Sequence, residues 1–343
     1  NPNVLPVTPS DRLTGYRNKA QIPVKEENGD IKIGYYAKNS HRVIENPNCD
    51  IQIAVSADII KALKLYMQAN GIKAWNEETN SGLIRHLLIR NGVNTGDVMV
   101  CLVINAKSGF IPFNISELIE DLSLIQGMKS ISLNYNTRND NVIMGDKCKT
   151  IWGSEYITDT MNGFTFRISP LSFYQVNPIQ ALKMYEKAVE LSKVTKDDVV
   201  VDAYSGIGTI ASFMALRAKK VYGIEIIPQA VSDAMVNAEI NGLSNVCFTT
   251  GKSEEVIFNL SENGIRPDII VLDPPRKGCE APVIEAIIET APRAVVYISC
   301  NPDTLARDAK ALRDGGYRLI ELHPYDMFVH SVHVESVALF ERG

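Results

Sequence analysis

Two apolar stretches of the sequence end in reactive side chains. Residues 295–299 are four strand-forming residues and a serine, and Cys300 follows them before an Asn-Pro pair stops the strand. Residues 268–272 are equally strand-like, and they lead into Asp273 and Arg276 of the run Asp-Pro-Pro-Arg. Open α/β sheets hold their chemistry at the carboxyl ends of strands, so a thiol, a carboxylate and a guanidinium are expected at one edge. A lone cysteine is most often a small buried hydrophobe, but this strand-end position favours a reactive thiol.

Another carboxylate opens the last strand-like segment of the chain. Glu335 follows His330 and His333. Two histidines beside a carboxylate would suit a metal ion, but no motif supplies a third ligand, so no metal is expected. Glu335 is instead expected near Cys300, where a nucleophile and a base would stand together.

A glycine turn marks a candidate cofactor site. A strand-like apolar run leads into Tyr204, Gly206 and Gly208, and Glu225 ends the next strand, nineteen positions after Gly206. Glycines let the backbone approach a ligand closely, and an acid at this spacing bonds ribose hydroxyls. Ala211 replaces the third glycine of the dinucleotide fingerprint, and no basic residue is placed to hold phosphate. A nucleoside without pyrophosphate fits better, and S-adenosylmethionine is such a ligand. The alternative is a tight turn in an enzyme with another cofactor.

A thiol beside a carboxylate suits methylation at carbon-5 of a pyrimidine. That carbon is too weak a nucleophile to attack a sulfonium methyl group unless a thiolate first adds to carbon-6. A base must then remove the carbon-5 proton so that the thiol is eliminated. A free thiol has a pKa of about 8.5, so Cys300 needs cationic or hydrogen-bonding help, and Arg276 is the candidate. The target base would have to leave its stack to reach such a pocket.

The composition is that of a soluble globular protein. The 343 residues carry a net charge of −5 and an apolar content of 45%, and no apolar run approaches the ~20 residues of a membrane helix. The pI of about 5.7 gives no global basic excess for nucleic-acid binding. No secretory signal is visible, and the six cysteines form no C-x-x-C pair. A reducing cytoplasm and a monomer are therefore expected, without disulfides or zinc.

The sequence predicts an arm and two domains. Residues 1–19 are rich in Pro, Asn and Ser and are expected to form an N-terminal arm. Residues 20–170 mix short strands with amphipathic helices and indicate an α+β subdomain. Residues 171–343 hold alternating strands and helices that predict a doubly wound α/β domain. Its sheet is expected to be mostly parallel and seven-stranded, closed by an antiparallel hairpin, with strands at 198–203, 220–225, 245–249, 268–273, 294–299, 317–323 and 334–341.

One basic cluster lies on a predicted strand pair of the α+β subdomain. It consists of Arg85, His86 and Arg90. A solvated sheet face is the simpler interpretation, and a contact with RNA is the alternative.

The motifs together resemble the RNA uracil-5-methyltransferase family of TrmA/RumA type. Residues 273–278, then sixteen residues, then residues 295–304 reproduce the family's nucleophile signature. Residues 326–335 resemble its second signature, with Val329 where proline is usual. The resemblance implies a class I, Rossmann-like methyltransferase fold, Cys300 as nucleophile and Glu335 as base. It also implies that Gln175, Tyr204, Gly206, Glu225 and Asp273 hold S-adenosylmethionine, and that Phe173 lines the uracil pocket.

The resemblance also bears on the N-terminal part and on the substrate. Family members commonly begin with a small β-barrel RNA-binding TRAM domain, and many bind an iron–sulfur cluster through four cysteines. Cys49 stands where the fourth would be, but the first three are absent, so no cluster is expected. An N-terminally trimmed protein is expected, with residues 20–170 in RNA recognition. The sequence looks most like the branch that methylates 23S ribosomal RNA, and the tRNA branch is the alternative.

Two other classes of protein compete with this interpretation. A methyltransferase acting on an exocyclic amine also uses Asp-Pro-Pro, but such enzymes usually place an aromatic residue where Arg276 stands and need neither Cys300 nor Glu335. A non-enzymatic RNA-binding or ribosome-assembly protein would need neither the cofactor motif nor the catalytic set.

Overall fold

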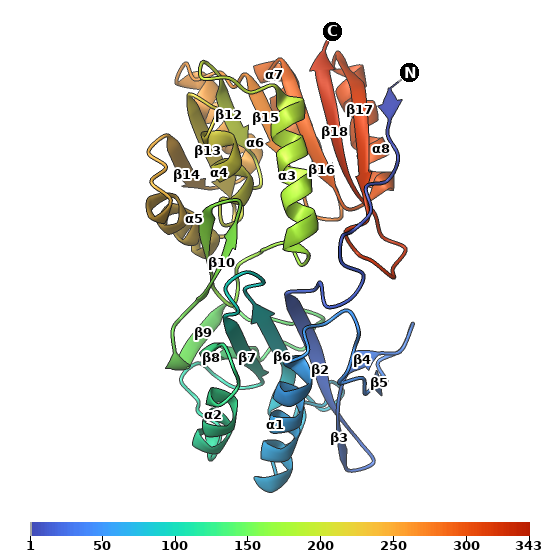
Figure 1. Ribbon diagram of the computed structural model, residues 1–343, viewed down its shortest axis with the longest axis vertical. Helices are drawn as coiled ribbons and strands as arrows, with labels where there is room; N and C mark the ends of the chain where they lie inside the picture. Colours follow the sequence, from blue (N-terminus) through green and yellow to red (C-terminus); the bar gives the residue numbers. More distant parts are fainter. Residues whose placement is uncertain (1) are drawn as a thin grey trace. The chain divides into compact units, whose positions relative to one another are not determined.

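The computed structural model describes residues 2–343, which form two compact units (Figure 1). Unit 1 comprises the residues up to Leu13, Met161–Phe166 and Ser172–Gly343. Unit 2 comprises Thr14–Thr160 and Arg167–Leu171. The contacts therefore divide the chain differently from the expected arm and boundary, since the N-terminal stretch packs within unit 1.

Unit 1 is built on an eight-stranded sheet in the order β1-β17-β18-β16-β15-β12-β13-β14. The strands from β14 to β16 pair in parallel, and β18 lies antiparallel between β16 and β17. The predicted α/β class, the mostly parallel sheet and the closing antiparallel hairpin are thus confirmed. The strands are β1 (Asn3–Val4), β12 (Val199–Asp202), β13 (Lys220–Glu225), β14 (Val246–Thr250), β15 (Ile269–Leu272), β16 (Ala294–Ser299), β17 (Tyr317–Tyr325) and β18 (Glu335–Arg342).

The eighth strand, β1, was not predicted. It is two residues long and pairs in parallel with β17, Asn3 opposite Glu321. A strand this short lies in a stretch rich in proline and asparagine and shows no alternation of apolar and polar residues, so no periodicity marks it. It covers the backbone edge of β17, which would otherwise be open to pairing with another chain.

Helices cover both faces of this sheet. Helices α3, α4 and α5 lie on one face, and α6, α7 and α8 lie on the other (Figure 1). Helix α3 begins where the Asn177 side chain accepts a hydrogen bond from the Gln180 amide, with proline at the first helical position. The helices are α3 (Pro178–Ser192), α4 (Thr209–Ala215), α5 (Pro228–Ile240), α6 (Ser253–Glu262), α7 (Ala281–Thr290) and α8 (Pro302–Asp314). The doubly wound arrangement leaves the carboxyl ends of the parallel strands free for a site.

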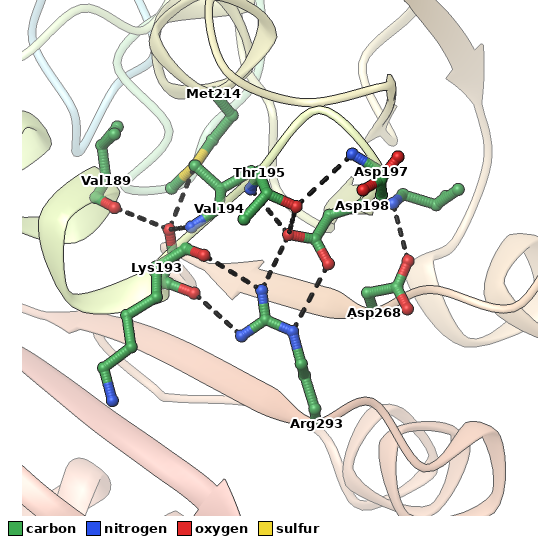
Figure 2. Close-up of polar contacts among 11 residues, drawn as sticks. Val189, Lys193, Val194, Thr195, Asp197, Asp198, Met214, Asp268 and Arg293 are labelled. Carbon is green, nitrogen blue, oxygen red and sulfur yellow. Dashed lines mark hydrogen bonds and ion pairs between the residues drawn. The ribbon is translucent and has the colours of Figure 1, made fainter.

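An arginine ties α3 to the amino ends of the strands, opposite the candidate site (Figure 2). Arg293 donates to the carbonyls of Ser192 and Lys193 at the end of α3, both at 3.2 Å, and pairs with Asp198 at 2.8 Å. Burial works against ionisation of Asp198, but Arg293 and Thr195 outweigh it and hold the pKa of Asp198 below its ordinary value. A cation at a helix carboxyl end also interacts favourably with the helix dipole.

Replacing Arg293 should weaken the fold without touching the site. We expect Arg293→Met to lower the free energy of unfolding by about 1–2 kcal/mol, because two helix-end carbonyls and Asp198 lose a donor that is itself partly exposed. Urea unfolding of the variant measures the loss. Arg313→Met is the matched control, since Arg313 pairs with its exposed neighbour Asp314, and it should change stability by less than about 0.5 kcal/mol.

Unit 2 is an α+β layer. Its six-stranded sheet has the order β3-β2-β6-β7-β8-β9, and α1 and α2 pack on it through one apolar core. A turn joins β2 to β3, with positive φ at Asn28 (53°) and Gly29 (79°), as a tight two-residue hairpin turn requires. The elements are β2 (Lys19–Glu27), β3 (Asp30–Ile33), β4 (Tyr35–Tyr36), β5 (Val43–Ile44), α1 (Ser56–Ala69), β6 (Ile84–Asn91), β7 (Val98–Ile104), α2 (Ile115–Ser123), β8 (Met128–Tyr135) and β9 (Lys147–Gly153). The short strands β10 (Ile157–Met161) and β11 (Phe164–Ile168) pair with each other.

The basic cluster on β6 differs from both interpretations of the sequence. Arg85, His86 and Arg90 are buried, with exposures of 2%, 7% and 2%. The Arg85 guanidinium lies 3.8 Å from the centre of the Trp75 ring and donates to the Asn136 carbonyl at 3.0 Å. Burial, and then the charge of Arg85, lower the pKa of His86 to about 4. Arg85 and His86 are therefore internal groups of unit 2 rather than a solvated face or an RNA-contacting surface.

Candidate active site

Three strand ends of the unit 1 sheet carry the predicted reactive groups. Asp273 directly follows β15, Cys300 directly follows β16, and Glu335 is the first residue of β18. The last registered pair of β16 and β18 is Ser299 opposite Ser336. Cys300 and Glu335 lie one step beyond this pair on adjacent antiparallel strands, a relation that puts Cβ atoms about 5 Å apart. The structure thus brings the predicted nucleophile and base together.

Burial of Glu335 and Asp273 at this edge favours the protonated forms of both carboxyl groups. Glu335 is 3% exposed, and its Oε2 has no hydrogen-bond partner. Burial, and then the charge of Asp273, raise the pKa of Glu335 well above its ordinary value. Burial also raises the pKa of Asp273 to about 7, although the Gln175 amide nitrogen donates to Asp273 at 3.4 Å and offsets part of the shift. The surroundings of Glu335 accordingly favour its protonated form more strongly than water does.

The thiol at this edge is subject to opposing influences. Burial raises the pKa of Cys300, the charges of Glu335 and Asp273 raise it further, and Arg276 lowers it only weakly. Arg276 is exposed and lies 3.0 Å from Nδ1 of His333. Arg276 thus acts on the thiol in the expected direction, but burial and the two carboxylates oppose it.

The glycine turn after β12 has the backbone that a closely approaching ligand needs. Gly206 and Gly208 have φ values of 53° and 84°, which residues with a side chain rarely adopt. A Cβ on Gly208 would come within 2.6 Å of the Phe248 ring, whereas one on Gly206 would meet no atom within 4 Å. Glu225 accepts hydrogen bonds from the amides of Gly206 at 3.1 Å and Ile227 at 2.9 Å. Open space at Gly206 beside a strand-end acid fits the nucleoside part of S-adenosylmethionine.

The remaining predicted residues divide between the two units. Gln175 is buried and Phe173 is 59% exposed, and both precede α3 in unit 1. Tyr204 is half-buried at the start of the glycine turn, and burial, followed by the neighbouring Cys279, raises its pKa. Arg85 and His86 belong to unit 2. Among residues 2–343, no group of three or more His, Cys, Asp or Glu side chains is arranged to hold a metal ion.

Two residues at this edge were missed in the sequence. Asp202, the last residue of β12, is fully buried, and neither of its carboxylate oxygens has a hydrogen-bond partner. Burial and then Asp273 raise its pKa to about 7, and the nearby amides of Tyr204 and Ala211 offset part of this shift without completing a hydrogen bond. Tyr185 of α3 is buried beside the carboxylates, which raise its pKa after burial itself. Asp202 ends a strand and Asp273 directly follows one, so Asp202 could have been found in the sequence from its position at a strand end. No feature of the sequence around Tyr185 indicates its place in the site.

Side chains of α8 fix the loop that bears Arg276. Asp308, 3% exposed, accepts hydrogen bonds from the Tyr297 hydroxyl at 2.6 Å and the Cys279 amide at 2.8 Å. Arg307 donates to the Cys279 carbonyl at 2.9 Å. The loop after Asp273 is thus held against α8 rather than free.

No helix among residues 2–343 combines the length and the apolar character needed to cross a bilayer.

Cys49 is a half-buried free thiol of unit 2.

Known proteins resemble the chain over nearly its whole length. The model of the tRNA (uracil-5-)-methyltransferase family matches residues 132–343. An uncharacterized RNA methyltransferase of Oceanobacillus iheyensis is 45% identical over 339 residues, which cover 98% of this chain and 73% of the relative. Another from Halalkalibacterium halodurans is 46% identical and covers 95% of this chain and 71% of the relative.

A solved structure agrees with these relatives. The crystal structure of Pyrococcus abyssi tRNA (uracil-54, C5)-methyltransferase, in complex with S-adenosyl-L-homocysteine, superimposes with a TM-score of 0.79 at 29% identity and covers 98% of this chain and 78% of that one. With the family match and the relatives, it establishes that the chain belongs to the tRNA (uracil-5-)-methyltransferase family and is an S-adenosylmethionine-dependent RNA methyltransferase with the class I fold.

Proposed function

We propose that the protein methylates carbon-5 of a uridine in RNA through a covalent bond between the Cys300 sulfur and carbon-6 of the base. The observation that carries the proposal is the opposition of Cys300 and Glu335 across β16 and β18. Methylation of an exocyclic amine requires neither a thiol nor a second carboxylate at this place. The pair is therefore accounted for by nucleophilic addition followed by proton removal.

The proposed cycle begins and ends with a free Cys300 thiolate. The Cys300 thiolate adds to carbon-6, and the electron pair of the carbon-5–carbon-6 double bond moves toward the carbon-4 carbonyl to give an enolate. Carbon-5 of the enolate then forms a bond to the electrophilic methyl group that S-adenosylmethionine would supply when bound, and the methyl–sulfur bond breaks to leave a neutral thioether. Glu335 then takes the proton from carbon-5, the double bond re-forms, and the Cys300 thiolate leaves. The nucleophile is regenerated, and one proton remains on Glu335.

The protonation states set a condition on this cycle. Cys300 must lose its proton to add, and Glu335 must be ionised before it can accept one. The site holds both groups with raised pKa values. A raised pKa makes Glu335 a stronger base once it is ionised, which suits removal of a weakly acidic carbon-bound proton.

We assign the other predicted residues to binding. Gln175, Tyr204, Gly206, Glu225 and Asp273 are proposed to hold the methyl donor, because they surround the glycine turn and the strand ends. Phe173 is proposed to contact the flipped uracil, since it is 59% exposed and follows the buried Ser172 that hydrogen-bonds Asp233 at 2.6 Å. Because its neighbour Ser172 is held in place, the exposed ring of Phe173 can offer a face for stacking.

For the acceptor we propose 23S ribosomal RNA, on the resemblance of the sequence to that branch. Transfer RNA is the second candidate, because the family description and the Pyrococcus structure both name it. Unit 2 is proposed to recognise the RNA, as expected for residues 20–170. The six free thiols suit a reducing compartment, and we propose a monomer acting in the cytoplasm.

The test is trapping with a fluorinated base. The full chain is incubated with S-adenosylmethionine and with 5-fluorouridine-substituted 23S ribosomal RNA fragments or tRNA, and intact-protein mass is measured after nuclease digestion. Fluorine cannot leave as a proton does, so a methylated nucleotide adduct on Cys300 is expected. Methylated RNA without any adduct would overturn the covalent mechanism in favour of the exocyclic-amine reaction. The RNA that gives the adduct identifies the acceptor.

A further inference from the structure

Three carboxylates meet at the carboxyl edge of the unit 1 sheet. Asp202 ends β12, Asp273 follows β15, and Glu335 opens β18. Asp202 and Glu335 are 0% and 3% exposed, while Asp273 keeps part of its surface accessible. The charge of Asp273 acts on both other carboxylates. Asp273 is thus the accessible member of an acidic group that we call the carboxylate triad.

The triad lacks a cation. Among residues 2–343, no lysine or arginine is a cause of the pKa shift of Asp273 or Glu335, and the two largest causes at Asp202 are burial and the charge of Asp273. The Arg276 guanidinium acts on Cys300 and lies beside His333. Buried like charges without a counter-ion are costly. The groups that face the triad from the packed elements are neutral or acidic: Gln175, Tyr185, Glu225 and Cys300.

Unsatisfied oxygens point to a missing ligand. Oε2 of Glu335 and both oxygens of Asp202 are buried and have no hydrogen-bond partner. Buried carboxylate oxygens normally have partners, and each exception calls for an explanation. The methyl donor carries a sulfonium cation, whereas its product is an uncharged thioether with the same nucleoside and amino-acid groups. The two molecules therefore differ in charge at one atom.

We propose that Asp202, Asp273 and Glu335 sense the sulfonium charge, so that donor binding releases protons from the triad and product binding does not. This inference rests on the proposed function for the role of Glu335. A cation near the triad favours its ionised forms, so a proton leaves as the donor enters. Glu335 is then ionised when the donor is bound, as the proposed cycle requires.

The same linkage acts in reverse after methyl transfer. The cation disappears when the thioether forms, and the triad again favours a proton. Glu335 thus becomes a stronger base at the stage when it must remove the carbon-5 proton. The uncharged product also loses the attraction that held the donor, which favours its release.

Proton counting by titration calorimetry tests the proposal without RNA. The full chain at pH 6.5 is titrated with S-adenosylmethionine and with S-adenosylhomocysteine in two buffers of different ionisation enthalpy. Donor binding should release about one proton more than product binding does. Between pH 6 and 7 the Kd of the donor should then fall about tenfold relative to that of the product. Equal proton release by the two ligands would overturn the proposal.

Two variants of β18 test which group releases the protons. Glu335→Gln should reduce the difference in proton release between donor and product, whereas Glu341→Gln, which alters an exposed glutamate of β18 paired with Lys193, should leave it unchanged. An unchanged difference in Glu335→Gln would remove Glu335 from the triad's response. Formation of the 5-fluorouridine adduct is independent of these results, so the covalent mechanism can stand while charge sensing fails. Absence of binding by both ligands would instead refute the role of this edge as the donor site.

Discussion

Glu335→Gln is expected to stop the enzyme with RNA covalently attached. The glutamine has nearly the shape of the protonated glutamic acid, so it should fit a site where the side chain is 3% exposed. Addition of Cys300 and methyl transfer would still occur, but no group would take the carbon-5 proton. A methylated uridine adduct should then accumulate on unmodified RNA, and turnover should fall by about 10²–10⁴-fold. Denaturing gels and intact mass measure the adduct.

The control for this variant lies on the same strand. Glu341→Gln removes one exposed charge of β18 and should turn over as the native protein does. Free, fully methylated RNA from Glu335→Gln at the native rate would show that another group is the base. Asp273 would then be the next candidate, since its pKa is raised to about 7 and it is partly accessible.

Cys300→Ala is expected to abolish methylation and adduct formation together. The nucleophile cannot be replaced by solvent, because water added at carbon-6 would not be positioned by the strand end. A loss of at least about 10³-fold is expected when a covalent nucleophile is removed. Binding of S-adenosylhomocysteine should remain within about threefold of the native value, because the glycine turn and Glu225 are untouched. Tritium release from carbon-5 of labelled uridine and calorimetry give the two readouts.

A second cysteine variant separates chemistry from general thiol effects. Cys247→Ala replaces an exposed cysteine of β14 and should leave the rate unchanged. Residual methylation by Cys300→Ala close to the native rate would exclude the covalent route. Loss of cofactor binding in the same variant would instead indicate that the alanine disturbs the strand end.

Much of unit 1 could be predicted because its local patterns are unambiguous. The buried strands β12, β15 and β16 are nearly continuous apolar runs, as strands covered on both faces must be. The glycine turn and the strand ends follow from them, so Cys300 and Asp273 could be placed at one edge. Their protonation could not be predicted, because it depends on burial and on charges brought together by register.

Unit 2 shows the opposite case. Arg85 is charged and lies in a strand, so the sequence favours a surface position. The structure buries it because the Trp75 ring stacks on its guanidinium and backbone carbonyls accept its protons. Asn136 is 51 positions from Arg85, and no local pattern indicates a partner of this kind. The two-residue strand β1 escaped prediction for a similar reason, since its only cue is its partner β17.

The position of β18 determines when the sheet of unit 1 can be completed during protein synthesis. Strand β18 follows β16 and β17 in the chain, yet it is inserted between them rather than added at an edge. Residues 14–160 of unit 2 emerge before β12, and can fold while the sheet of unit 1 is still being synthesised. The sheet of unit 1 cannot be completed before β18 is made, and this strand begins with Glu335. A chain released before β18 is made would therefore lack both a complete sheet and the proposed base. Incomplete synthesis should yield inactive and aggregation-prone protein.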